Sequence, residues 1–79
     1  MNIFKIIEED TEYYIDFDFV GQIVLRKSIN EIKIIFKNNM PAIVLKPSNK
    51  QAFKELSEKL IKKFNDGVDI STIKTIEVL

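Results

Sequence analysis

Residues 12–45 read EYYIDFDFVGQIVLRKSINEIKIIFKNNMPAIVL, and this stretch decides the fold. Its first part, Glu12 to Val20, alternates polar and apolar side chains, which is typical of a strand buried on one face. Gly21, Asn30 and the pair Asn38–Asn39 then interrupt the apolar runs with residues that favour tight turns. The stretch therefore predicts consecutive antiparallel hairpins.

The apolar pattern indicates the register of the first expected hairpin. If residues 20–22 form its loop, Phe17 lies opposite Leu25 and Asp16 lies opposite Arg26. Both pairs are favourable, because apolar faces apolar and acid faces base. A shift by one residue would place Phe17 opposite Arg26 and would turn the apolar set of this strand to the other face.

Two further hairpins give the same inner face. A turn at Ile29–Asn30 places Leu25 opposite Ile34, and a turn at Asn38–Asn39 places Glu31 opposite Lys46. The expected inner face consists of Phe17, Phe19, Ile23, Leu25, Ile32, Ile34, Phe36, Ile43 and Leu45. Agreement among the three registers favours one antiparallel sheet.

A helix is expected after the strands. Ser48 and Gln51 have the spacing of a capping box, which starts a helix. The helix should run from Asn49 to Asp66 and end before Gly67, a residue common just after helices. Its apolar stripe, at helical spacing, consists of Ala52, Phe53, Leu56, Leu60, Ile61 and Phe64.

Two end segments complete the predicted fold. Ile3–Ile7 is expected to form a first strand, and Thr72–Leu79 a last strand at the sheet edge beside it. We therefore predict one α+β domain over residues 1–79, a five- to six-stranded antiparallel meander with one amphipathic helix packed on one face (β-β-β-β-β-α-β). A chain of 79 residues has the size of a single domain.

Composition limits the chemistry that this chain can perform. Acidic and basic residues number 12 each, whereas a protein that coats DNA normally has a basic excess. The chain has no Cys and no His, which removes disulfides, thiolate metal sites and the commonest general base. No apolar run approaches the roughly 20 residues of a membrane span, and residues 1–5 lack a signal-peptide pattern. We expect a cytoplasmic protein without a cofactor.

Two acidic groups are candidate reactive sites. Asp16 and Asp18 lie on one face of an expected strand, at a spacing that suits paired catalytic carboxylates. Residues 8–12 include Glu8, Glu9, Asp10 and Glu12, which could supply oxygen ligands to Ca²⁺ or Mg²⁺ but lack the EF-hand spacing. Solvated charges explain both groups better, so we predict neither an enzyme nor a metal site.

Charge is segregated along the chain. Residues 1–20 hold six acidic residues and one basic residue, and residues 21–66 hold ten basic and four acidic residues. Such a distribution can steer a charged partner. Solvation of the helix explains the basic part about equally well, because five of the ten basic residues belong to the expected helix.

The outer face of the expected sheet is only partly polar. Residues expected to point away from the helix include Tyr14, Val24, Ile35, Ala42 and Val44. A sheet face open to water would be more polar, and a mixed strip of this kind is typical of an interface. Three interpretations stay open: a homodimer contact, a binding site for a partner protein, or a curled sheet that buries these residues in a second small core.

These features favour a small non-catalytic protein-binding module, of the inhibitor or adaptor kind that phages and mobile elements encode. The module would occupy a partner's surface, with an acidic second strand that mimics nucleic acid phosphates. The residues expected to bind the partner are Glu12, Tyr14, Asp16, Asp18, Val24, Ile35 and Val44. A structural homodimer is a further alternative.

Binding of single-stranded nucleic acid is the other alternative. In the expected register Arg26 lies opposite Lys33, a like-charge pair that a phosphate would relieve. Tyr14 could stack on a base. The residues expected to contact the phosphates are Arg26, Lys33, Lys37 and Lys46.

The chain resembles the single-stranded-DNA-binding transcriptional coactivators, whose fold is four strands and then a helix. The resemblance lies in the order of the strands, the run Ile43–Pro47 and the helix that follows it. The resemblance covers residues 12–64 and implies a nucleic acid partner. This chain departs from that family in the late position of Phe53 in the helix and in the additional last strand.

Overall fold

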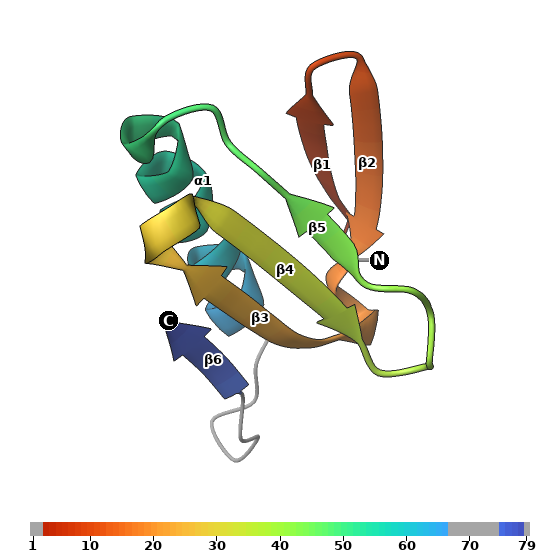
Figure 1. The fold of residues 1–79 in the computed structure, drawn as a ribbon. Helices are drawn as coiled ribbons and strands as arrows, with labels where there is room; N and C mark the ends of the chain where they lie inside the picture. Colours follow the sequence, from red (N-terminus) through yellow and green to blue (C-terminus); the bar gives the residue numbers. More distant parts are fainter. Residues whose placement is uncertain (1–2, 67–74, 79) are drawn as a thin grey trace.

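The computed structural model describes residues 3–66 and 75–78 of the chain. Along the chain the elements are β1 (Ile3–Glu8), β2 (Thr11–Asp16), the 3₁₀ turn η1 (Phe17–Phe19), β3 (Val20–Arg26), the 3₁₀ turn η2 (Lys27–Ile29), β4 (Glu31–Phe36), β5 (Ile43–Leu45), α1 (Lys50–Asp66) and β6 (Thr75–Val78). The α+β class with one long helix agrees with the sequence-based prediction (Figure 1).

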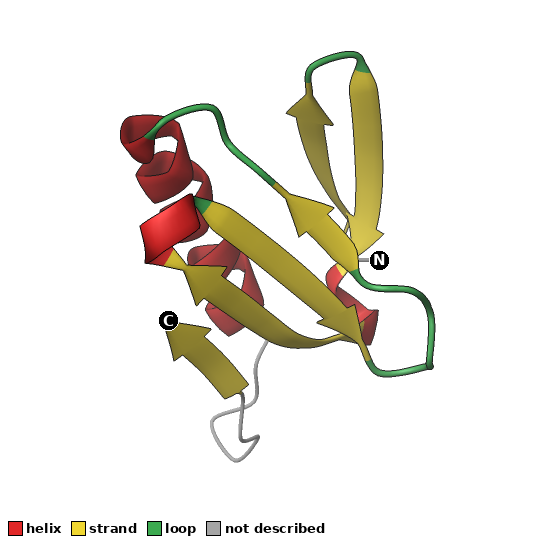
Figure 2. Cartoon of the chain, in the orientation of Figure 1, coloured by secondary structure: helices red, strands yellow, loops and turns green. Residues whose placement is uncertain are grey.

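The strands form two sheets instead of one meander. β1 and β2 make a separate antiparallel hairpin, and the other sheet has the order β5-β4-β3-β6. β3–β4 and β4–β5 are antiparallel, whereas β3–β6 is parallel. The helix α1 lies behind the four-stranded sheet, and the β1–β2 hairpin stands beside β5 (Figure 2). The expectation of a continuous five- to six-stranded meander is therefore wrong.

The break between the two sheets lies at η1, inside the segment expected to be the second strand. The Asp16 carboxylate accepts a 3.0 Å hydrogen bond from the amide of Asp18, which caps the 3₁₀ turn. Successive side chains of a 3₁₀ turn are about 120° apart, so the alternation of a strand does not continue through it. Phe17 is consequently buried, while Phe19, expected on the inner face, is 47% exposed.

Gly21 lies within β3 and not in a hairpin loop. The β3–β4 register shifts between Val20 and Gln22, so Gly21 is the extra residue of a bulge. A Cβ atom at this position would lie 3.3 Å from the Cγ atom of Lys37, so glycine permits the close approach of this neighbouring side chain. The expected hairpin between the second and third strands, with Phe17 opposite Leu25 and Asp16 opposite Arg26, is not formed.

The β3–β4 hairpin has the expected faces but a register shifted by two residues. Leu25 lies opposite Ile32, and Arg26 lies opposite Glu31. The loop holds the whole of η2 and ends at Asn30, whose φ of 50° and ψ of 46° are left-handed. Because side chains alternate with a period of two, this shift leaves every residue on its expected face.

The β4–β5 pairing confirms the third expected register. Ile32 lies opposite Leu45, and Ile34 lies opposite Ile43. The predicted charge pair is also formed, since the Lys46 Nζ atom lies 4.0 Å from the Glu31 Oε1 atom.

The helix begins one residue later than expected. Asn49 and not Ser48 is the N-cap, because the Asn49 Oδ1 atom accepts a 2.8 Å hydrogen bond from the amide of Ala52. Phe53, Leu60 and Phe64 of the expected stripe are buried.

One apolar core joins the hairpin, the four-stranded sheet and the helix. Its buried members are Ile6, Ile15, Phe17, Val20, Ile23, Leu25, Ile32, Ile34, Leu45, Phe53, Leu60 and Phe64. The rings of Phe4 and Phe17 pack at a centroid distance of 5.7 Å.

Helices in the described part of the chain are too short or too polar to cross a bilayer.

The last strand has a different neighbour from the expected one. β6 pairs with β3, with Ile76 in register with Ile23, and not with β1. The start of the expected strand, residues 72–74, and Gly67 lie outside the described residues.

Candidate functional site

The outward face of the β1–β2 hairpin carries large apolar side chains. Alternation in the ladder places six residues on this face, which we name the hairpin face: Ile3, Lys5, Ile7, Glu12, Tyr14 and Asp16. Ile3 is 43% exposed, Ile7 63% and Tyr14 64%, while the opposite side of the hairpin packs on the core. The hairpin thus presents an apolar surface to solvent.

Charged groups hold the centre of the hairpin face in place. The Lys5 Nζ atom lies 3.2 Å from the Glu12 Oε1 atom, and it also lies 5.7 Å from the centroid of the Tyr14 ring. The Tyr14 hydroxyl donates a 3.3 Å hydrogen bond to the Glu12 Oε2 atom. Lys5 therefore offsets the charge of Glu12 and supports the aromatic ring from one side.

Two of the carboxylates expected to mimic phosphates have other partners within the chain. Glu12 is paired with Lys5, and the half-buried Asp16 caps η1. Asp18 is exposed on η1. A ribbon of free carboxylates along the second strand is therefore not formed, because its strand ends at Asp16.

The remaining residues expected to bind a partner belong to the four-stranded sheet. Val24 is only 6% exposed although it lies outside the central core cluster, Ile35 is half-buried, and Val44 on the edge strand is 43% exposed. Val24 thus contributes little accessible surface. The structure gathers Glu12, Tyr14, Asp16 and Asp18 on the hairpin and the following turn, and places the three aliphatic residues on the other sheet.

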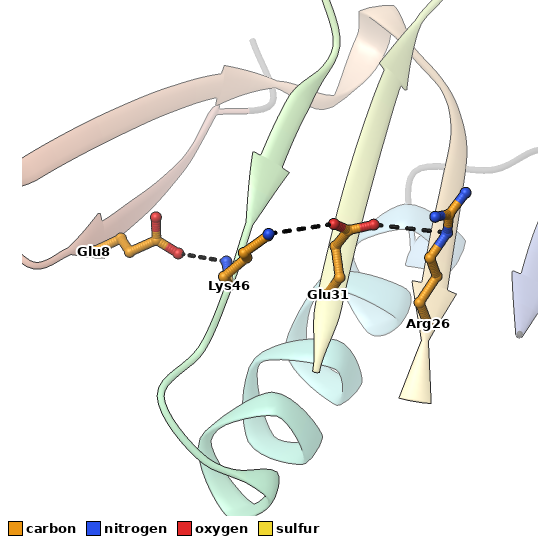
Figure 3. A network of polar contacts seen from close by, with 4 residues as sticks. All are labelled: Glu8, Arg26, Glu31 and Lys46. Atoms are coloured by element: carbon orange, nitrogen blue, oxygen red, sulfur yellow. Dashed lines mark hydrogen bonds and ion pairs between the residues drawn. The ribbon is translucent and has the colours of Figure 1, made fainter. Parts of the chain in front are cut away.

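Two of the four basic residues proposed to track phosphates, Arg26 and Lys46, lie on either side of an acidic residue. Glu31, whose side chain is 13% exposed, lies between the Arg26 Nε atom at 3.6 Å and the Lys46 Nζ atom at 4.0 Å (Figure 3). The expected juxtaposition of Arg26 and Lys33 is wrong, because Arg26 lies opposite Glu31 and Lys33 opposite Val24. Lys37 directly follows β4 and is exposed.

A cleft of about 420 Å³ runs along β1 on the side away from β2. We name it the β1 cleft. Its walls are β1, the connection from β5 to α1, and the first half of α1. The lining residues are Phe4, Lys5, Ile6, Ile7, Glu8, Glu9, Lys46, Pro47, Ser48, Ala52, Glu55, Leu56 and Lys59.

Sequence reasoning missed Ile3, Ile7 and the β1 cleft. The segment Ile3–Glu8 reads IFKIIE, in which both alternating sets contain apolar residues. Such a run is typical of a strand that is covered on both faces, and this signal could have pointed to an exposed apolar surface in a two-stranded hairpin. The cleft depends on contacts between segments distant in sequence, so no local pattern indicates it.

The acidic turn does not form a metal site in the part of the chain described here. No group of three or more carboxylates is arranged there to hold an ion. Glu8 and Glu12 have other partners, since the Glu8 Oε2 atom accepts a 2.8 Å hydrogen bond from the amide of Lys46 and Glu12 binds Lys5.

Comparison with protein-family models, with curated proteins and with solved structures gives no match for this chain.

Proposed function

We propose that this chain is a small non-catalytic protein-binding module that docks through the hairpin face. The observation that carries the proposal is the exposure of Ile3, Ile7 and Tyr14 on a hairpin whose other side is already packed on the core. Exposed apolar side chains rimmed by charges have the composition of an interface, and tyrosine is enriched in such surfaces. Three large apolar side chains are exposed on the hairpin face, whereas of the aliphatic residues predicted to bind on the other sheet Val44 is exposed and Val24 is buried.

The arrangement of Lys5 and Glu12 supports the same function. Their ion pair and the Tyr14–Glu12 hydrogen bond hold the tyrosine ring in one orientation before a partner arrives. Preorganisation of this kind lowers the entropy lost on binding. By occupying a partner's surface, such a module would act as an inhibitor or an adaptor.

A photo-crosslinking amino acid at position 14 tests this proposal in cells of the source organism. We expect one discrete adduct of defined stoichiometry. The matched control carries the same amino acid in place of Ile29, which is 54% exposed on η2, away from the hairpin face. Equal adducts from positions 14 and 29, or none from position 14, would contradict the proposal. An adduct with the mass of two copies of the chain would identify self-association as the function of this face.

A further inference from the structure

The backbone of β1 has an unpaired edge. Glu8 and Thr11 flank a two-residue turn and are in register, so they form a hydrogen-bonded pair of the antiparallel ladder. Hydrogen-bonded and non-hydrogen-bonded pairs alternate, and within residues 3–66 and 75–78 β1 pairs with β2 alone. The main-chain N–H and C=O groups of Lys5 and Ile7 therefore point away from β2.

These groups open onto the β1 cleft. The apolar parts of its lining are Phe4 and Ile6 of β1 and Ala52 and Leu56 of α1. Its volume of about 420 Å³ lies within the range of about 300–1,000 Å³ that is common for ligand sites. A strand paired with β1 would lie about 4.8 Å from it, with every second side chain directed to the apolar lining.

The free edges of β2 and β5 are less suited to an added strand. Of the outward positions of β2, two are acidic (Glu12 and Asp16), whereas β1 has one charged outward residue, Lys5. Charges on an edge oppose strand addition, so the β2 edge is the less suitable of the two. β5 has only three residues and is followed closely by Pro47. β1 has six residues, without proline or bulge.

Charges along β1 give the cleft a direction. Lys5 lies toward one end, and Glu8 and Glu9 lie at the other, about 13 Å away along the chain. Lys46 also lines the acidic end, where its main-chain amide donates to Glu8, so Glu9 is the acidic group there without such a bond to Lys46. In an antiparallel segment, the first residue lies beside the acidic end and the last beside Lys5. The complementary occupant is thus a segment that begins with a basic residue and ends with an acidic one.

We propose that an extended peptide segment of a partner protein adds to β1 as a third, antiparallel strand of the β1–β2 sheet. Its basic N-terminal end lies at Glu8 and Glu9, and its acidic C-terminal end lies at Lys5. Main-chain hydrogen bonds to Lys5 and Ile7 give affinity, and the apolar lining selects the side chains between them. This inference rests on the proposed function and names the class of partner.

The test uses the blocked pentapeptide acetyl-Lys-Val-Thr-Val-Glu-amide and the full chain labelled with ¹⁵N. At millimolar peptide, we expect the amide signals of Lys5 and Ile7 to shift. The control peptide acetyl-Glu-Val-Thr-Val-Lys-amide has the same composition with reversed charges. It should bind about tenfold more weakly, because both exposed charge pairs become repulsive.

N-methylation of the peptide separates strand addition from other binding. A methyl group on the nitrogen of the central Thr removes a donor to β1 and should abolish the shifts. A methyl group on the nitrogen of the second Val points away from β1 and should leave binding in place. On the protein side, Lys5→Pro removes the donor to the peptide but none to β2, so it should abolish binding, whereas Lys5→Ala should retain it in part.

Three results would overturn the inference: no shifts at Lys5 and Ile7, equal binding of the two charge orders, or equal effects of both N-methyl groups. The peptide modifications need no change in the protein, so a failure of Lys5→Pro to fold leaves the test intact. Shifts confined to Tyr14 and Glu12 would overturn strand addition while supporting the hairpin face as a docking surface. If position 14 gives no crosslinked adduct but the peptide still binds, the hairpin face is overturned as a docking surface and strand addition to β1 is supported.

Discussion

The carboxylate of Glu8 accepts a 2.8 Å hydrogen bond from the main-chain amide of Lys46, 38 positions later in the chain (Figure 3). Glu8 ends β1 and Lys46 follows β5, so this bond joins the separate hairpin to the four-stranded sheet. Lys46 in turn approaches Glu31, which also pairs with Arg26. A row of polar contacts therefore crosses both sheets at one end of the molecule.

Replacing Glu8 by Ala should loosen the attachment of the hairpin. The loss of one hydrogen bond to a charged acceptor costs about 1–2 kcal/mol of the free energy of unfolding. Urea denaturation would measure this cost, and hydrogen exchange at the Lys46 amide should become faster. Glu8→Gln keeps an acceptor and should stay closer to the wild type. Equal exchange at Lys46 in all three proteins would show that the bond has no stabilising role.

Replacing Glu9 by Gly should stabilise the protein. Glu9 has a φ of 55° in the β1–β2 turn, a conformation that costs an L-residue energy and glycine none. We expect a gain of about 0.5–1 kcal/mol after the larger entropy loss of glycine is included. Asp10→Gly is the control, since Asp10 has no positive φ and should lose stability. A loss at both positions in urea denaturation would disprove the strain at Glu9.

Asn49→Ala should destabilise the protein by about 1 kcal/mol, because it removes the acceptor for the Ala52 amide. Ser48→Ala should have almost no effect. Thermal unfolding followed by circular dichroism would compare the two variants. A larger loss of stability in Ser48→Ala than in Asn49→Ala would instead support the capping box expected from the sequence.

Ile34→Val should cost about 1 kcal/mol, because it removes a methyl group at a position with 0% exposure. Ile29→Val removes the same group at a position that is 54% exposed and should leave stability almost unchanged. Urea midpoints of the two variants provide the measurement. Similar midpoints would contradict the placement of Ile34 in the centre of the core.

Local sequence patterns were sufficient to predict which strand residues face the core and where the helix lies. The period of two placed Ile23, Leu25 and Ile32 inside even though the β3–β4 register was wrong by two residues, because a shift by two keeps the face. The helical stripe placed Phe53 and Leu60 in the core in the same way.

The break between the two sheets at η1 and the exposed hairpin face could not be predicted, because both depend on interactions that a local sequence pattern does not indicate. The run Phe17–Phe19 alternates like a strand, yet it forms a 3₁₀ turn, which is capped by the hydrogen bond from the Asp18 amide to the Asp16 carboxylate. With the strand broken there, the first hairpin became a sheet of its own with an exposed face. Tyr14 was therefore expected on a surface, but Ile3 and Ile7 were not recognised as its neighbours.

All antiparallel pairs in the described chain connect strands that follow one another in sequence. Short loops close quickly and at low entropic cost, so each hairpin can form by itself within microseconds. We expect the slower events in folding to be the packing of these hairpins on the helix and the long-range parallel pairing of β3 with β6. Substitutions at Leu60 of α1, which belongs to the core shared by both sheets, should alter the folding rate more than substitutions in the turn at Glu9.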